Sequence, residues 1–123
     1  MSNQPLEKDL DPTPLVNAII EKTKAGRLKW EATASPNTLI ASVGGNTTLK
    51  IYLEIATRLD TLGISAQIEV PVLSLLDDKG RTLWEISNRD VKGNLDPLFR
   101  LARRMGNKLD ERMEALMEVV QKL

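Results

Sequence analysis

The sequence contains no cysteine and no histidine. Without cysteine there is no disulfide, and no thiol is present to act as a nucleophile or a metal ligand. Because the usual zinc sites and the Ser-His and Cys-His nucleophile pairs need one of these two side chains, they are excluded as well. We predict no catalytic, metal-binding or cofactor-binding residues. The enzymatic alternative is a small enzyme that relies on carboxylates, with magnesium as their metal.

Aromatic residues are also scarce, and neither sign of charge dominates. Only 3% of the chain is aromatic, and 17 basic residues balance 17 acidic ones. The chain therefore has no overall field that would attract nucleic acid or an anionic membrane. It also lacks the stacking side chains on which single-stranded nucleic acid usually binds. Any nucleic-acid binding must come from a local basic patch.

The length and composition indicate one folded domain. The chain has 123 residues, of which 41% are hydrophobic and 28% charged, as in an average globular protein. Residues 1–12 read as a flexible tail, and residues 13–123 as a single domain. No run of 18 apolar residues and no apolar leader segment is present, so neither a membrane span nor secretion is predicted. We expect a cytoplasmic protein.

A first helix is predicted directly after the tail. Thr13 is a typical N-cap and Pro14 fits the first helical position, while Gly26 suits the left-handed residue that ends a helix. Apolar residues between them recur at helical spacing.

The middle of the chain alternates between apolar and polar residues, which is typical of half-buried strands. Two hairpin turns are predicted, at Gly44-Gly45-Asn46 and at Asp77-Asp78-Lys79-Gly80. The first is not a phosphate-binding loop, because no Gly-Lys follows it. The second is not a calcium loop, because it lacks the spacing of the calcium ligands. Pro71 predicts a bulge or an edge position, because proline cannot donate to the ladder. Strands are predicted at residues 27–33, 38–43, 47–55, 67–76 and 81–87, with a connection at 56–65 that contains at most one helical turn.

A long helix is predicted over residues 94–121, because apolar residues step by three and four without losing phase. Gly106-Asn107 interrupts it. We favour one helix with a kink, since one interior glycine costs only about 1 kcal/mol. Two separate helices are the alternative, with Gly106 as the stop of the first and Asn107 as the N-cap of the second.

Together these elements predict an α+β fold. About five strands form an antiparallel meander, and the N-terminal helix and the long C-terminal helix pack on one face of the sheet. Trp30 and Trp84 share the parity of aliphatic neighbours, so both are expected to face the core. The polar segment from Asn88 to Asn94 is expected to be a loop that caps the last helix.

Two surfaces are candidates for partner binding. Tyr52 falls on the polar side of its strand and is expected to be exposed, where it could anchor a partner. The end of the last helix carries an apolar surface wider than a simple stripe. Ordinary core packing is the favoured interpretation of this surface, and a contact with a second copy is the alternative. Its residues are Leu116, Met117, Val119, Val120 and Leu123.

A basic cluster in the last helix is the sharpest local charge feature. Arg100, Arg103, Arg104 and Lys108 could contact phosphate. Acidic residues on the same outer face partly neutralise the cluster, which favours a solvated helix surface over nucleic-acid binding.

The leading functional hypothesis is a non-catalytic interaction module without a cofactor. It binds another protein or itself, as a homodimer, through the sheet face around Tyr52 or through the last helix. The alternatives are a weak nucleic-acid binder that uses the basic cluster and the carboxylate-dependent enzyme.

Overall fold

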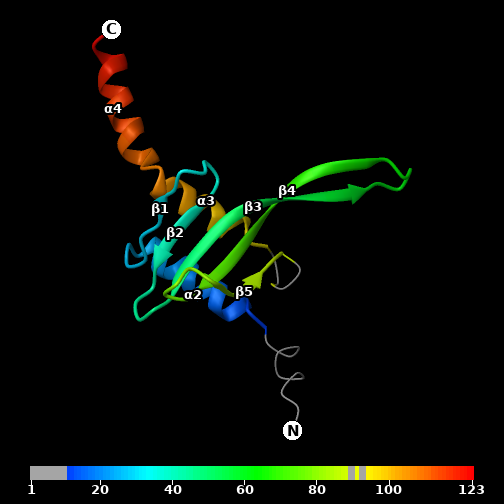
Figure 1. Ribbon diagram of the computed structural model, residues 1–123. Helices are drawn as coiled ribbons and strands as arrows, with labels where there is room; N and C mark the ends of the chain where they lie inside the picture. The colour runs from blue at the N-terminus through cyan, green and yellow to red at the C-terminus, as the bar shows by residue number, and fades with distance from the viewer. Residues whose placement is uncertain (1–10, 89–90, 92–93) are drawn as a thin grey trace.

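The computed structural model describes residues 11–88, 91 and 94–123 (Figure 1). One five-stranded sheet has the strand order β1-β2-β3-β4-β5, and each strand runs antiparallel to its neighbour. The predicted α+β class and the antiparallel meander are therefore confirmed. Most of the predicted tail, residues 1–12, lies outside the described residues. The elements are α2 (Thr13–Lys24), β1 (Glu31–Ala32), β2 (Leu39–Ser42), β3 (Thr48–Leu59), β4 (Ser65–Leu76), β5 (Thr82–Ile86), α3 (Asp96–Gly106) and α4 (Leu109–Gln121).

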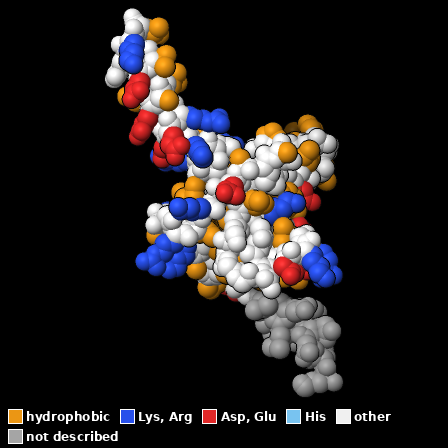
Figure 2. Space-filling model, turned by 60° about the vertical axis from the view of Figure 1, so that its left-hand side comes forward, with side chains coloured by type: hydrophobic (Ala, Val, Ile, Leu, Met, Phe, Trp, Pro, Cys, Tyr) orange, Lys and Arg blue, Asp and Glu red, His pale blue; other side chains and the backbone are white. Residues whose placement is uncertain are grey.

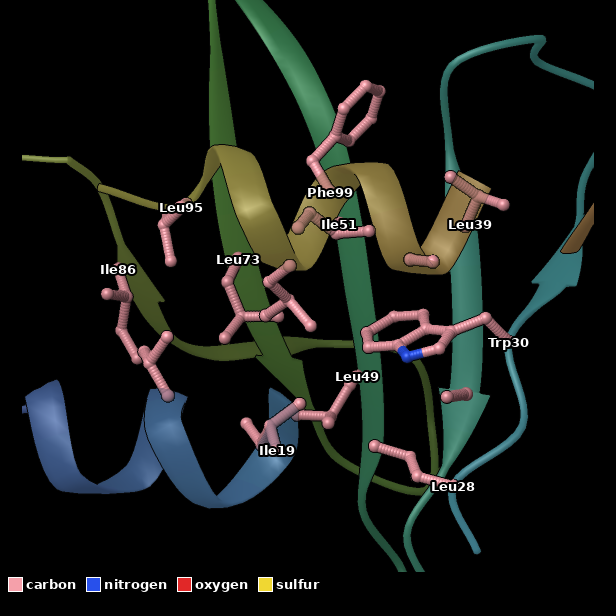
Figure 3. Packing of buried hydrophobic residues seen from close by; sticks show 14 of the residues in the cluster. Ile19, Leu28, Trp30, Leu39, Leu49, Ile51, Leu73, Ile86, Leu95 and Phe99 are labelled. Atoms are coloured by element: carbon pink, nitrogen blue, oxygen red, sulfur yellow. The ribbon is translucent and has the colours of Figure 1, made fainter. Parts of the chain in front are cut away.

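Helices α2 and α3 lie side by side on one face of the sheet, as Figures 1 and 3 show. Their apolar side chains meet those of the central strands in one buried cluster, which includes Ile51, Leu73 and Leu98. Alternation along β3 sends Leu49 and Ile51 into this cluster. The opposite face is mixed: it carries polar side chains such as Lys50 and also apolar ones such as the buried Val72.

The first helix begins and ends close to the predicted residues. Its N-cap is Pro12 rather than Thr13. The Asp11 carboxylate accepts a hydrogen bond from the Thr13 amide at 3.0 Å, so the capping oxygen comes from outside the helix. Gly26 has φ +74°, and the prediction of a left-handed residue there is confirmed.

The predicted strand at residues 27–33 is much shorter than expected, since only Glu31–Ala32 pairs with β2. Leu28 and Trp30 are nevertheless buried, as the alternation predicted. Trp84 was expected in the core, but 37% of it is exposed. It lies on the last strand of the sheet, where no further strand shields it on one side.

The predicted connection at residues 56–65 is too long, because only residues 60–64 join the two strands. Strand β3 continues to Leu59, a turn follows, and β4 begins at Ser65, so the two strands pair along twelve positions from Thr48↔Leu76 to Leu59↔Ser65. The sequence loses its alternation here because both faces of this part of the hairpin are largely exposed. We call the portion from Leu53 to Pro71 the outer ribbon; it projects from the sheet in Figure 1.

Pro71 does not produce a bulge, because the register shift of β4 lies between Leu75 and Leu76. Pro71 pairs with Leu53 of β3. On its other side β5 pairs with β4 from Leu73 to Leu76. Pro71 therefore lies beyond the end of β5, at the kind of unpaired edge that tolerates proline.

The favoured interpretation of one long, kinked helix is wrong, because α3 ends at Gly106 and α4 begins at Leu109. Lys108 has φ +53°, a left-handed conformation that breaks the helix. The alternative prediction of two helices placed a left-handed Gly106 at the end of the first helix, and this detail is wrong as well. Gly106 stays helical, and Asn107 and Lys108 are the C-cap and the N-cap of the two helices.

Only the first of these two helices packs on the sheet, which corrects the prediction that the whole C-terminal helix does so. Helix α3 contacts β1, β2 and β3, whereas α4 extends away from the sheet (Figure 1). Within the described residues, no helix is long and apolar enough to cross a membrane.

Candidate protein-interaction surfaces

Helix α4 is exposed along its whole length. Figure 2 shows it standing clear of the body of the molecule, and every residue from Leu109 to Leu123 is classed as exposed. The five apolar residues predicted as a surface at the end of the last helix lie here, and they are 55–96% exposed. The interpretation of ordinary core packing is therefore wrong, because the break at Lys108 carries α4 away from the sheet.

The apolar residues of α4 form one broad face. At about 100° per residue, they occupy an arc of about 160° around the helix axis. Arg112 lies inside this arc near one of its edges, and the other charged residues lie outside it. Five members of the arc were predicted from the sequence, and Leu109 and Met113 were not. We call this surface the α4 face; its apolar members are Leu109, Met113, Leu116, Met117, Val119, Val120 and Leu123.

The outer ribbon carries a second exposed apolar surface. Ile55 and Leu59 point to the same side of β3 as the buried Leu49 and Ile51, because all four share one parity. They are 66% and 68% exposed, since the covering helices do not extend to the ribbon. We call this side the ribbon face. It consists of Leu53, Ile55, Thr57, Leu59, Ser65, Gln67, Glu69 and Pro71. Pro71 is buried and Leu53 packs partly against the core, so Ile55 and Leu59 are the exposed apolar residues of this face.

The turn of the ribbon is firmly held. The Asp60 carboxylate accepts hydrogen bonds from the amides of Leu62 and Ile64, each at 2.9 Å. The Asp60 amide donates to the Ile64 carbonyl, and Gly63 has φ +81°. Leu62 is 82% exposed at the tip. The turn thus presents apolar side chains on a fixed backbone.

Sequence reasoning missed the ribbon face, although two signals were available. Leu59 keeps the parity of Leu53 and Ile55, although Thr57 interrupts the apolar alternation between them. The pattern Asp-x-x-Gly from Asp60 to Gly63 also repeats the pattern from Asp77 to Gly80, which was recognised as a turn.

Tyr52 lies on the uncovered face of the sheet but is only partly exposed, which corrects the expectation of a free anchor. Its hydroxyl donates to Glu85 Oε2 at 2.7 Å, and the Ser74 hydroxyl donates to the same oxygen at 2.9 Å. Lys50 Nζ lies 5.1 Å from the centre of the Tyr52 ring. Burial and the bond to Glu85 raise the pKa of Tyr52, and the bonds from Tyr52 and Ser74 lower the pKa of Glu85. Tyr52 therefore serves a polar network that links three strands.

The four residues of the basic cluster are all exposed. Arg104 bonds to Asp110 Oδ1 at 2.8 Å, and the Arg103 guanidinium lies 5.6 Å from the centre of the Phe99 ring. Arg104 of α3 thus bridges to the first turn of α4, whereas Arg103 lies over an aromatic ring of its own helix. Arg100 and Lys108 complete the cluster.

Two depressions of the surface are shallow. One of about 380 Å³ lies between the end of α2 and the α3–α4 junction, where Lys24, Arg104 and Lys108 face Asp110 and Glu111. Another of about 470 Å³ lies beside the start of the first hairpin, next to Leu28 and Val43. In the part of the chain that the structure describes, no three acidic side chains gather closely enough to hold a metal ion.

The comparisons with known proteins found no matching family model, no similar curated protein and no similar solved structure.

Proposed function

We propose that this protein is a non-catalytic interaction module that associates with a second copy of itself, and that the α4 face forms the contact. The observation that carries this proposal is the exposure of six apolar residues on a helix with no buried residue, together with Leu123 just beyond the end of that helix. A monomeric protein rarely leaves so continuous an apolar surface in water.

The width of the α4 face supports burial in a complex. An apolar stripe of about 100° suffices for a helix that lies on a core, and a two-helix coiled coil needs a narrower seam still. The arc of α4 exceeds both, so the helix is suited to a site that surrounds it on more than one side. Each Leu, Met or Val that becomes fully buried there contributes about 1.5–3 kcal/mol.

The second copy is favoured as the partner because one chain exposes two apolar surfaces on two projecting arms. These arms are helix α4 and the outer ribbon. The α4 face and the ribbon face both belong to a molecule whose core is otherwise closed. A stable interface of ordinary size covers about 800 Å² on each partner. A helix of 13 residues alone offers less than this, whereas the two arms together approach it.

Sedimentation velocity over a range of protein concentrations tests the proposal. We expect the unmodified chain to form a dimer and Leu116→Glu to be a monomer, because a charge in the centre of the α4 face cannot be buried without a partner. Gln121→Glu is the matched control, since it adds the same charge to the polar side of the same helix, and it should dimerise normally.

Circular dichroism of both variants separates loss of contact from loss of the helix. An unmodified chain that remains monomeric at high concentration would refute the proposal, and so would a Leu116→Glu variant that dimerises as well as Gln121→Glu.

A further inference from the structure

We propose that the contact is reciprocal: the α4 face of each copy covers the ribbon face of the other. This inference rests on the proposed function and specifies how the two copies meet. It uses both exposed apolar surfaces at once, and it requires no change in the fold of either chain.

The ribbon face continues a surface that is already covered by helices. Leu49 and Ile51 of β3 lie beneath helices α2 and α3, whereas Ile55 and Leu59, on the same side, have no helix above them. A two-stranded ribbon is marginally stable alone and gains stability when a helix packs on it. The missing cover for the ribbon face is therefore an amphipathic helix.

The helix that covers it must come from another chain. Helix α4 and the outer ribbon leave the core in different directions, so the α4 face cannot reach the ribbon face of its own chain (Figure 1). In two copies related by a two-fold axis, each arm can reach the other molecule. Such an arrangement repeats one contact twice and closes as a dimer.

The two surfaces match in length. Helix α4 has 13 residues, which span about 20 Å. The seven residues of β3 from Leu53 to Leu59 span about 20 Å as well. A helix laid along the ribbon would cover the exposed Ile55 and Leu59, and its inner end would lie beside Leu53, which is already partly buried.

The surfaces also match in charge. The structure describes every residue of the ribbon face, and Glu69, opposite Ile55, is the one charged side chain among them. The charged side chain within the α4 arc is Arg112. Each apolar face thus carries one charge, and the two charges are of opposite sign. Complementary charges of this kind set the partner and the register of an interface.

Charge exchange between the two faces tests the inference. We expect Glu69→Arg and Arg112→Glu to weaken dimerisation each by about tenfold, because the two-fold axis repeats the altered contact. The double variant, E69R with R112E, should restore the dissociation constant to within about threefold of the unmodified value, because it reverses both charges of the pair. Sedimentation velocity at low salt measures all three.

Two matched controls lie on the same elements. Glu54→Arg makes the same change on the opposite side of the ribbon, and Lys122→Glu reverses a charge on the polar side of α4. Both should dimerise normally. The inference would be overturned if Glu54→Arg weakened dimerisation as much as Glu69→Arg does, or Lys122→Glu as much as Arg112→Glu. Net charge would then explain the effect.

The outcomes also separate this inference from the proposed function. If Leu116→Glu abolishes the dimer but Glu69→Arg and Ile55→Asp leave it intact, the chain associates through α4 without the ribbon face. The reciprocal contact is then wrong and the proposed function stands. If the unmodified chain is a monomer, both fail. Loss of the dimer in Ile55→Asp, with unchanged circular dichroism and restoration in the charge-exchanged double variant, supports both.

Discussion

Gly106 lies so close to Leu39 that a β-carbon on Gly106 would overlap the Leu39 side chain. The same β-carbon would lie 3.2 Å from the Ala32 backbone nitrogen. Leu39 is fully buried, so its side chain has little room to shift. The last turn of α3 therefore packs directly against β1 and β2, and this contact requires glycine for its lack of a side chain rather than for its backbone freedom.

Gly106→Ala should consequently destabilise the protein, although alanine favours a helix over glycine by about 1 kcal/mol. Forcing a methyl group into a packed site typically costs about 1–3 kcal/mol, so we expect a net loss of about 1 kcal/mol in the free energy of unfolding. Urea denaturation measures it. Arg100→Ala, on the exposed side of the same helix, should change stability by less than about 0.5 kcal/mol. A variant at position 106 more stable than the unmodified chain would contradict the packing argument.

The position of Gly106 also explains where the sequence analysis went wrong on the last helix. Apolar phase continues through Gly106-Asn107, so periodicity alone favours one helix. The break depends on the tight contact of Gly106 with Leu39 and on the strained conformation of Lys108, and neither leaves a trace in hydrophobic spacing. The alternation of the strands and the turn at Gly44-Gly45-Asn46, in contrast, were sufficient to predict the sheet, because those signals are local.

For the candidate surfaces, too, local features could be predicted from the sequence and long-range features could not. Apolar residues on α4 were recognised from the sequence, but their exposure was not, since it depends on the direction in which α4 leaves the core. Tyr52 was predicted to be free because its partner Glu85 is 33 residues away in the chain. Contacts over that distance follow from strand register, which the sequence did not determine.

Thr23 anchors the buried indole of Trp30, and replacing it tests the hydrogen bonding of the core. Trp30 Nε1 donates to the Thr23 hydroxyl at 3.0 Å, and that hydroxyl donates to the Ile19 carbonyl at 2.8 Å. Thr23→Val keeps the shape but leaves the indole N–H without a partner, which should cost about 1–3 kcal/mol of stability. Thr23→Ser keeps the hydroxyl and should lose less. Equal losses for the two variants, measured by thermal unfolding, would argue that packing rather than the hydrogen bond matters here.

Tyr52 is the single tyrosine of the chain, so its ionisation can be followed by absorbance. Because burial and Glu85 raise its pKa above 10.0, we expect tyrosinate to form at a higher pH than in the unfolded chain. Glu85→Gln should lower the Tyr52 pKa only in part, since burial is the larger cause. A titration unchanged by Glu85→Gln would show that the Tyr52–Glu85 bond does not persist in solution.

The same pair predicts how stability depends on pH. The folded pKa of Tyr52 is raised, so its contribution is complete below the unfolded value of 10.0 and is lost as the pH rises through the folded pKa. The folded pKa of Glu85 is lowered below 4.5, so its contribution is present above that value and is lost as the pH falls through the folded pKa. The stability difference between the unmodified chain and Glu85→Gln should therefore shrink at both extremes. If the stability difference between these two proteins did not depend on pH, the Tyr52–Glu85 pair would not couple stability to pH.

Asp60 and Asp77 build two hairpin turns of the same design, and comparing them tests whether the outer ribbon is a separate local unit. In each turn the carboxylate accepts hydrogen bonds from two backbone amides at 2.8–2.9 Å, and a left-handed glycine follows three residues later.

The Asp77 turn joins β4 to β5, which carries the fully buried Ile86. Asp77→Ala should thus lower global stability by about 1 kcal/mol. At concentrations low enough for the chain to be monomeric, Asp60→Ala should leave global stability within about 0.5 kcal/mol. It should raise amide hydrogen exchange only between Ile55 and Gln67, because no residue of this part of the ribbon is buried. If both variants lost the same amount of global stability, the outer ribbon would fold and unfold together with the core. The ribbon would then not open locally on its own.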